Sequence, residues 1–281
     1  MKQENIFGAE LSYTPCRYGS SRMLFRGPRR RLDRPYIAFL GGTETFGKFI
    51  ERPFPALVEK EIRQTCVNLG CVHGGIDTYV NDTTVMDICS GADITVLQIT
   101  ASCNMSNRFY SVHPRRNDRF QKPSTVLKAI YDEVDFSQFS FAKEMLGVLM
   151  AASPERFDIV VAELAQAWIA RMRQMLHQIG PKVTLLWLSE EELTDTHWSD
   201  RIDPLKTEPL FVTRSMVNEL RPLVSDIVRV KPSRAAIAEG TRGMVFPEGQ
   251  DRAAAQMMGI AGHAEVSEVL ASALRDNLRA A

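Results

Sequence analysis

Tyr36-Ile-Ala-Phe-Leu-Gly-Gly-Thr-Glu-Thr-Phe-Gly-Lys48 decides the fold of this 281-residue chain. The first five residues are an apolar run typical of a buried strand, and two glycines then end the run abruptly. A threonine pair and a third glycine follow, which is typical of a strand that delivers a tight loop to a functional site. The stretch therefore predicts an α/β fold with its site at the end of this strand.

Strand and helix patterns alternate along the rest of the chain. We expect further strands at residues 65–69, 94–99, 183–188 and 227–230, and helices at residues 55–65, 82–90, 124–134, 139–152, 157–179, 214–220 and 262–278. This order predicts a doubly wound three-layer sandwich with a mostly parallel five-stranded sheet. Residues 1–35 are expected to form an extension that wraps the domain. Residues 36–281 are expected to form a single α/β domain with a helical insertion around residues 124–180.

Composition argues against several classes of partner. Lys plus Arg and Asp plus Glu number 34 each, so no net charge draws the whole chain to nucleic acid or to an anionic membrane. No apolar run approaches the roughly 20 residues that a membrane span needs, and the polar N-terminus does not resemble a signal peptide. We therefore expect a cytoplasmic protein with no nucleic-acid or membrane partner.

The cysteines and histidines do not follow a metal-binding or disulfide pattern. The five cysteines are an odd and scattered number, so a reducing compartment and at least one free thiol are expected. Cys66, Cys71, His73, Cys103 and His113 fall near predicted strand ends but include no Cys-x-x-Cys pair. We expect no metal and no cofactor.

A phosphate-binding P-loop is one interpretation of the first glycine loop. The stretch from Gly42 to Lys48 fits the first seven positions of that motif. Phe49 stands where a magnesium-binding Ser or Thr should follow, and the strand at 94–99 carries no acidic residue for the metal. A degenerate phosphate or nucleotide binder therefore stays open as an alternative.

Several blocks of the chain, in order, resemble the SGNH (GDSL-like) hydrolases. Residues 39–47 resemble the first block of that family, Asn68-Leu-Gly70 with Gly74 the second, residues 96–104 the third, and residues 262–270 the start of the closing helix. The resemblance spans roughly residues 36–274 and implies an SGNH-like α/β domain. The chain is also similar to an uncharacterised family of alphaproteobacterial proteins that share the segment Phe-Tyr-Ser-Val-His-Pro-Arg-Arg-Asn-Asp-Arg-Phe.

The resemblance also implies roles for particular residues. Thr43 occupies the position of the nucleophilic serine, while Gly74 and Asn104 occupy the positions of the oxyanion donors. The Asp-x-x-His dyad of the family falls on Ala254 and Met257, neither of which can act as a base. Any chemistry therefore needs non-standard catalytic residues.

Residues 107–120 are predicted to be a loop at the carboxyl edge of the sheet, where open α/β folds bind ligands. Its arginines are donors suited to phosphate, sulfate or carboxylate, its aromatic side chains offer flat faces to a sugar or base, and His113 is the best-placed general base. The alternative is a solvated loop whose arginines pair with nearby acidic residues. The residues expected to bind substrate are Gly42, Glu44, Thr45, His73, Asn107, Arg108, Tyr110, Arg115, Arg116 and Arg119.

Two classes of function follow from these patterns. The first is a divergent SGNH-like hydrolase or group transferase acting on an acylated, sulfated or phosphorylated, and hence anionic, small-molecule or glycan-like substrate. The second is a non-catalytic protein that keeps the binding pocket without the Asp-His dyad. A histidine ring nitrogen within about 3 Å of the Thr43 hydroxyl would favour the enzyme.

Overall fold

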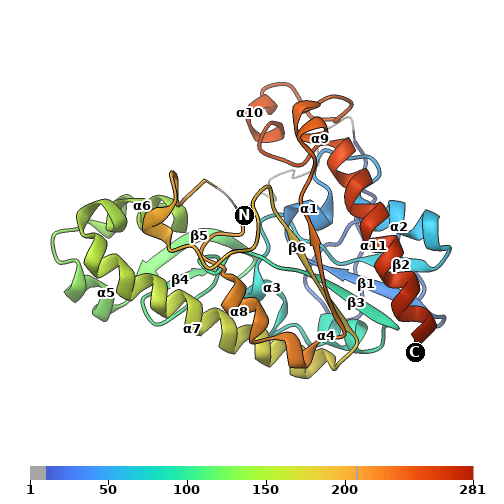
Figure 1. Ribbon diagram of the computed structural model, residues 1–281, viewed down its shortest axis with the longest axis horizontal. Helices are drawn as coiled ribbons and strands as arrows, with labels where there is room; N and C mark the ends of the chain where they lie inside the picture. Colours follow the sequence, from blue (N-terminus) through green and yellow to red (C-terminus); the bar gives the residue numbers. More distant parts are fainter. Residues whose placement is uncertain (1–10, 207, 281) are drawn as a thin grey trace.

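Five parallel strands form the central sheet of the protein, in the order β2-β1-β3-β6-β7 (Figure 1). The structure is a computed structural model that describes residues 11–206 and 208–280. The strands are β1 (Tyr36–Leu40), β2 (Thr65–Asn68), β3 (Ile94–Gln98), β6 (Val183–Leu188) and β7 (Asp226–Val230). The predicted doubly wound α/β fold with a parallel five-stranded sheet is confirmed.

The helices lie on both faces of this sheet and at its edges. They are α1 (Thr43–Phe46), α2 (Phe54–Ile62), α3 (Ile76–Tyr79), α4 (Thr83–Ser90), α5 (Thr125–Ile130), α6 (Ala142–Ala152), α7 (Pro154–Ile179), α8 (Arg214–Asn218), α9 (Arg234–Ala238), α10 (Asp251–Ala254) and α11 (Ile260–Ala280). Short 3₁₀ turns lie at Phe136–Gln138, Trp198–Asp200 and Arg221–Leu223. No helix in these described ranges is both long and apolar enough to cross a membrane.

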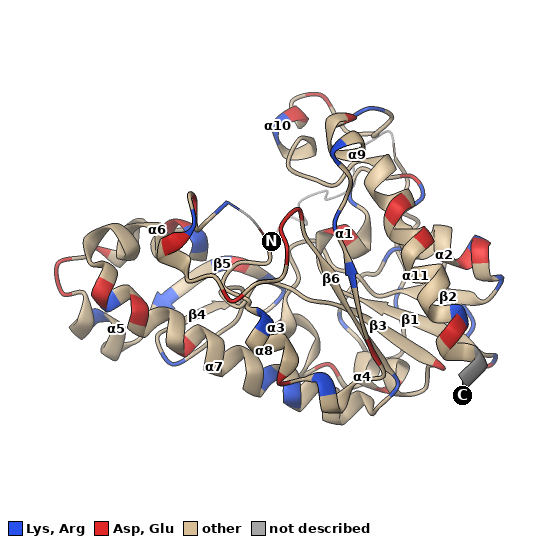
Figure 2. Cartoon of the chain, in the orientation of Figure 1, with Lys and Arg blue, Asp and Glu red and all other residues tan. Residues whose placement is uncertain are grey.

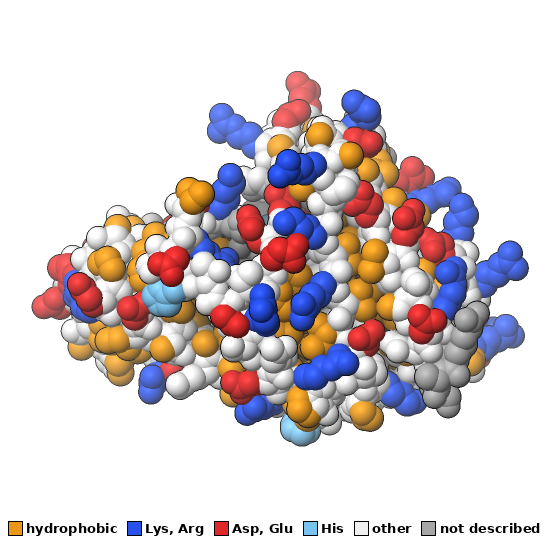
Figure 3. All heavy atoms as spheres, in the orientation of Figure 1, with side chains coloured by type: hydrophobic (Ala, Val, Ile, Leu, Met, Phe, Trp, Pro, Cys, Tyr) orange, Lys and Arg blue, Asp and Glu red, His pale blue; other side chains and the backbone are white. Residues whose placement is uncertain are grey.

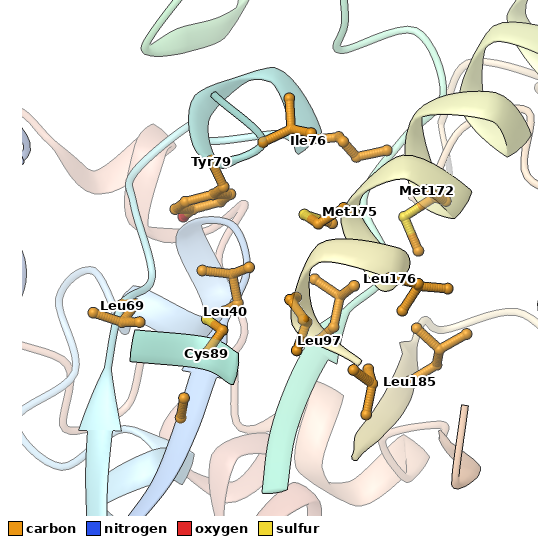
Figure 4. Close-up of a cluster of buried hydrophobic side chains, with 14 of the residues drawn as sticks. Leu40, Leu69, Ile76, Tyr79, Cys89, Leu97, Met172, Met175, Leu176 and Leu185 are labelled. Atoms are coloured by element: carbon orange, nitrogen blue, oxygen red, sulfur yellow. The ribbon is translucent and has the colours of Figure 1, made fainter. Parts of the chain in front are cut away.

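The side chains of β1 alternate between two cores because successive strand residues point to opposite faces. Ala38 and Leu40 pack with α3, α4 and α7 on one face, in the cluster drawn in Figure 4. Ile37 and Phe39 pack with α2 and α11 on the other face. Every residue of β1 is buried, which explains why the strand reads as a continuous apolar run.

A third hydrophobic cluster lies beside the sheet, in a lobe built from α5, α6 and the first half of α7 (Figure 1). Two antiparallel strands, β4 (Tyr110–His113) and β5 (Arg116–Pro123), belong to this lobe. The predicted loop at residues 107–120 is therefore wrong, because most of it forms a β-hairpin. Tyr110, Val112 and Phe120 are the buried residues that hold the hairpin to the lobe.

The described part of the N-terminal segment, from residue 11 onward, packs against the sheet domain, while residues 1–10 of the expected extension lie outside the described residues. Tyr13, Tyr18 and Phe25 are almost fully buried, and Cys16 forms an isolated antiparallel bridge with Phe25. Arg26 is also buried and donates to main-chain carbonyls just after α1. The N-terminal segment is therefore hydrogen-bonded to the first loop through Arg26.

Candidate functional site

The candidate site lies where β1 and β3 end, at the switch point of the sheet. The chain runs from β1 to β2 on one side and from β3 toward β6 on the other, so the connections after these two neighbouring strands run in opposite directions. Ligands of open α/β sheets bind in the crevice that such a reversal creates beyond the carboxyl ends of the strands. The loops that begin at Gly41 and at Ile99 flank this point.

Buried polar contacts fix the loop after β1. Gln98, the last residue of β3, accepts hydrogen bonds from the Gly42 N–H at 3.1 Å and from the Thr45 hydroxyl at 2.6 Å. The Tyr79 hydroxyl donates to the Gly41 carbonyl at 2.5 Å. Because each of these groups is buried, each would be costly to leave unpaired. These hydrogen bonds therefore fix the backbone on both sides of Thr43.

The second glycine loop lies directly against the first. A Cβ atom on Gly70 would lie 2.3 Å from the backbone nitrogen of Phe46, so only glycine fits this approach. The N–H of His73 donates to Oγ1 of Thr43 at 3.0 Å, and a Cβ atom on Gly42 would lie 3.3 Å from the carbonyl oxygen of Gly74. The structure therefore brings Gly42, Thr43, His73 and Gly74 together, although they come from two loops.

The β4–β5 hairpin is pinned to the second loop by Asn117, which is fully buried. Its N–H donates to the His73 carbonyl at 3.0 Å, and its side-chain oxygen accepts the N–H groups of Gly75 at 2.9 Å and Thr78 at 3.2 Å. This pin places the neighbouring Asp118 beside the His73 ring, with Oδ2 3.5 Å from Nδ1. The imidazole is 32% exposed and the carboxylate 19% exposed.

Positive charge gathers around this imidazole. Burial lowers the pKa of His73, and the nearby charges of Arg116, Lys48 and Arg119 lower it further, while Asp118 opposes the change. The pKa of Lys48 is lowered as well, first by burial and then by Arg116. Burial is the main cause of both shifts, and the neighbouring cations add to each of them. A group of cations of this kind attracts an anion.

Glu44, expected to bind substrate, contacts the start of α11 and the segment just before it. Its Oε2 accepts the N–H of Met258 at 3.3 Å and lies 4.0 Å from Nε2 of His263. Burial raises the pKa of Glu44 to about 7, because few groups replace the water that a carboxylate needs. The carboxyl group next to Thr43 therefore keeps its proton to a higher pH than an ordinary glutamate.

The groups expected to supply a base and an oxyanion hole have other partners. Nδ1 of His113 accepts the N–H groups of Arg115 at 3.2 Å and Arg116 at 3.1 Å, so this ring caps the hairpin turn. The N–H of Gly74 donates to the Cys71 carbonyl at 2.9 Å. Asn104 is half-buried after β3, and its side-chain oxygen lies 3.7 Å from Sγ of Cys103. No hydrogen bond joins a histidine ring to the Thr43 hydroxyl among the described residues.

Four residues expected to bind substrate support the structure. Thr45 is 1% exposed, and its hydroxyl donates a hydrogen bond to the Gln98 side chain. Tyr110 is 2% exposed, and its hydroxyl donates a hydrogen bond to the Cys103 carbonyl. The Asn107 side chain accepts the N–H groups of Phe109 and Tyr110 in a turn. Arg108 pairs with Glu163 at 2.9 Å, which is the structural role left open for it. These contacts give the four residues structural roles, and their role in substrate binding stays a prediction.

The structure adds three residues to the candidate site that were not predicted there. The sequence places Lys48 in the first glycine loop and Asp118 among the acidic residues near the arginines, without assigning either to the site. Asn117 had no predicted role. The Asn-Asp pair directly after the paired arginines was the available signal, because Asn and Asp are typical of tight turns and so mark a possible hairpin here.

The first loop does not have P-loop geometry. In a P-loop the lysine opens the helix that follows the glycines. Here α1 already begins at Thr43 and ends at Phe46, and Lys48 follows it after Gly47 in the left-handed conformation. The helix starts too early for a phosphate-cradling loop to form before it.

The described surface drawn in Figures 2 and 3 carries charged side chains of both signs. Charges of both signs are spread over the cartoon in Figure 2, in keeping with the balanced composition. Figure 3 shows that the molecule is hollowed between the lobe of α5 and α6 and the segment of α9 and α10, with charged side chains on the rim. Nowhere within residues 11–206 and 208–280 do three metal-binding side chains gather, and all five cysteines, which lie in these ranges, are free thiols.

Comparisons with known proteins give a family but no activity. No curated protein matches the chain. Among solved structures, the crystal structure of the lipase Lip_vut3 from goat rumen metagenome is similar, at 13% identity and a TM-score of 0.39, covering 85% of this chain and 97% of that chain. A family model matches residues 1–278. The chain therefore belongs to the family described as Domain of unknown function (DUF6473).

Proposed function

We propose that the protein is a divergent SGNH-like hydrolase or group transferase that acts on an anionic substrate, an acylated, sulfated or phosphorylated glycan-like molecule. The observation that carries this proposal is the contact of the Thr43 hydroxyl with the second glycine loop, beside the cations around His73. A hydroxyl at the end of β1 stands at the switch point, where a substrate would enter. The cations give the class of substrate, because they favour an anion.

The hydroxyl of Thr43 is suitably prepared for attack. A hydroxyl has one proton to donate and two lone pairs that accept. Since the His73 N–H occupies one lone pair, the proton remains available for a base. An internal threonine is an unusual nucleophile because its methyl group crowds the approach, so the proposal makes Thr43 a direct experimental target.

The second candidate is a non-catalytic protein that binds the same anion. The observation in its favour is that ring nitrogens of His73, His113 and His263 contact Asp118, the Arg115 N–H and Glu44 respectively, rather than the Thr43 hydroxyl. In the part of the chain that the structure describes, the Thr43 hydroxyl is therefore not paired with a histidine ring, whereas simple hydrolysis by a threonine would require such a pair. Catalytic hydrogen bonds often become short only when the substrate binds. One experiment can therefore test both candidate functions.

The experiment is a screen of the full chain against acyl esters and sugar phosphates, with Thr43→Ala beside the wild type. Turnover that is lost in Thr43→Ala supports the hydrolase or transferase, and turnover that survives excludes Thr43 as the nucleophile. Sulfate and phosphate titrations of Arg115→Ala and Arg116→Ala test the binding site. No turnover together with weakened anion binding in these variants would favour the non-catalytic candidate, whereas unchanged affinity would remove the anion site.

A further inference from the structure

We propose that His73 and Asp118 form the acid–base dyad of this site and replace the Asp-x-x-His pair that is missing before α11. His73 is the group that exchanges the proton, and Asp118 is a positioning residue that acts through the ring. This inference deepens the proposed function and depends on it. The two residues come from different elements that are far apart in the sequence: His73 lies in the second glycine loop and Asp118 in the β4–β5 hairpin.

The two side chains are held together by their backbones. The N–H of Asn117 donates to the His73 carbonyl, and the Asn117 side chain holds Gly75 and Thr78 on the same loop. Asp118 follows Asn117 directly, so its carboxylate cannot drift far from the ring. The separation of 3.5 Å between Nδ1 and Oδ2 lets Asp118 favour the tautomer with its proton on Nδ1. The lone pair then lies on Nε2.

The backbone of His73 is also set in an unusual way. Its φ angle is 58°, in the left-handed region that few residues other than glycine adopt and in which Asn, Asp and His are the commonest of those few. In this conformation the N–H of His73 points at Oγ1 of Thr43. The same residue therefore orients the hydroxyl with its main chain and offers a base with its side chain. Strain of this kind is concentrated at functional sites.

The charges around the ring select the substrate. Burial, together with the charges of Arg116, Lys48 and Arg119, disfavours a protonated imidazole, whereas Asp118 favours it, and the net effect lowers the pKa of His73. A neutral ring can accept a proton, but the resulting imidazolium would face three cations. An anionic group bound among those cations would offset their charge and raise the basicity of His73. The dyad should therefore work best on substrates that carry a negative charge near the reacting ester.

The proton movements balance without any additional reactant except water. Nε2 of His73 accepts the hydroxyl proton of Thr43 while Oγ1 forms its bond to the acyl carbon. The bond from the acyl carbon to the leaving oxygen then breaks, and the leaving oxygen receives the proton from Nε2. Water removes the acyl group from Thr43 by the same two transfers, which restores the free hydroxyl and the neutral ring.

The test compares His73→Asn and Asp118→Asn with the wild type. Asparagine tolerates the left-handed backbone, so the first variant should keep the fold. His177→Asn, on the exposed side of α7, and Asp132→Asn, in an exposed turn, are the matched controls. Initial rates are measured across pH with 4-nitrophenyl acetate and with the mono-4-nitrophenyl ester of succinate, which adds a negative charge.

The expected result is a loss of about 100-fold or more in kcat for His73→Asn, about 10-fold or more for Asp118→Asn, and no change for the controls. The wild type should prefer the charged ester. A wild-type enzyme that turns over while His73→Asn keeps its rate within about twofold overturns the dyad and leaves the proposed function standing. A wild type that turns over no ester overturns both.

A second measurement does not depend on turnover. In nitrogen-15 spectra of the labelled full chain, the ring of His73 should carry its proton on Nδ1, and Asp118→Asn should weaken that preference. Replacing chloride by sulfate should raise the pKa of His73, because the anion offsets the neighbouring cations. A ring protonated on Nε2, or a pKa that ignores both sulfate and Asp118→Asn, contradicts the inference even if the protein is an enzyme.

Discussion

The buried ring of His263 faces the carboxylate of Glu44, with Nε2 of the histidine 4.0 Å from Oε2 of the glutamate. Nδ1 of the ring accepts the N–H of Phe54 at 3.2 Å, so the ring proton of the neutral form lies on Nε2. Within the described residues this Nε2 is buried without a hydrogen-bond partner. The contact connects α1, next to Thr43, with α11, and it places two shifted titratable groups at one junction.

Glu44→Gln should make the protein more stable at alkaline pH. Burial raises the pKa of Glu44 from 4.5 to about 7, so the folded state holds its proton more tightly than the unfolded state. Stability therefore falls as pH rises from about 4.5 to about 7 and stays reduced above that range. At about 1.4 kcal/mol per pKa unit, and with part of the group still hydrated, the penalty is about 1–3 kcal/mol.

Urea unfolding at pH 5 and pH 8 measures this penalty. The variant should exceed the wild type in free energy of unfolding at pH 8 and match it near pH 5. Glu248→Gln, in an exposed loop, is the control and should show no such dependence. An equal difference between Glu44→Gln and the wild type at both pH values would show that ionisation of Glu44 is not the cause.

The wild type should lose stability in acid because of His263, and His263→Asn should remove that loss. Burial, followed by the charge of Arg26, lowers the pKa of His263 from 6.5 to about 3, so the ring stays neutral in the folded state. The unfolded chain takes up a proton below about pH 6.5, and stability falls by about 1.4 kcal/mol for each further pH unit toward 3. Asparagine retains an acceptor for the Phe54 N–H but does not titrate. Urea unfolding across this pH range should therefore show the unfolding free energy of the variant rising relative to that of the wild type as pH falls. A difference that stays constant with pH would contradict this prediction.

The sheet could be predicted from the sequence because its three central strands, β1, β3 and β6, are buried along their whole length. β6, for example, is an apolar run with no exposed residue, which leaves little choice but a central strand. The loops after β1 and β2 were recognisable for a related reason, since close backbone approaches such as that of Gly70 to Phe46 require glycine. Local patterns therefore identified Thr43 and His73.

The hairpin could not be predicted in this way. β5 buries Asn117 and Phe120, which are three residues apart, while charged side chains fill most of its other positions. A strand without regular alternation reads as a polar loop. The contact between His73 and Asp118 depends on that hairpin and on its pin to the second loop, so the sequence alone did not bring the pair together.

Arg26→Met should destabilise the fold around the first loop. The buried guanidinium donates to four carbonyls, those of Phe46 at 3.2 Å and of Gly47, Ile50 and Glu51 at 2.7 Å each. Methionine fills the space but leaves the carbonyls without this donor. The expected cost is about 3–5 kcal/mol, because charge-assisted hydrogen bonds in a buried site are individually strong.

Thermal and urea unfolding of Arg26→Met and Arg26→Lys measure this cost. Lysine lacks the planar fork that reaches four acceptors, so it should recover only part of the loss. Arg22→Met, an exposed arginine of the same segment, is the control and should be nearly neutral. Full rescue by lysine would mean that charge alone matters, and no loss in methionine would mean that the segment does not support the loop.

Thr43→Ser separates the two parts of the threonine side chain. Serine keeps the hydroxyl that accepts the His73 N–H and loses the methyl group that crowds an attacking oxygen. If the hydroxyl is the nucleophile, kcat for an acyl ester should equal or exceed that of the wild type, by up to about tenfold, which corresponds to about 1.4 kcal/mol in the barrier. Thr43→Ala should fall to background in the same assay. Equal inactivity of the serine and alanine variants, with unchanged unfolding free energies, would instead assign the methyl group to substrate packing, since the hydroxyl alone would then be insufficient for turnover.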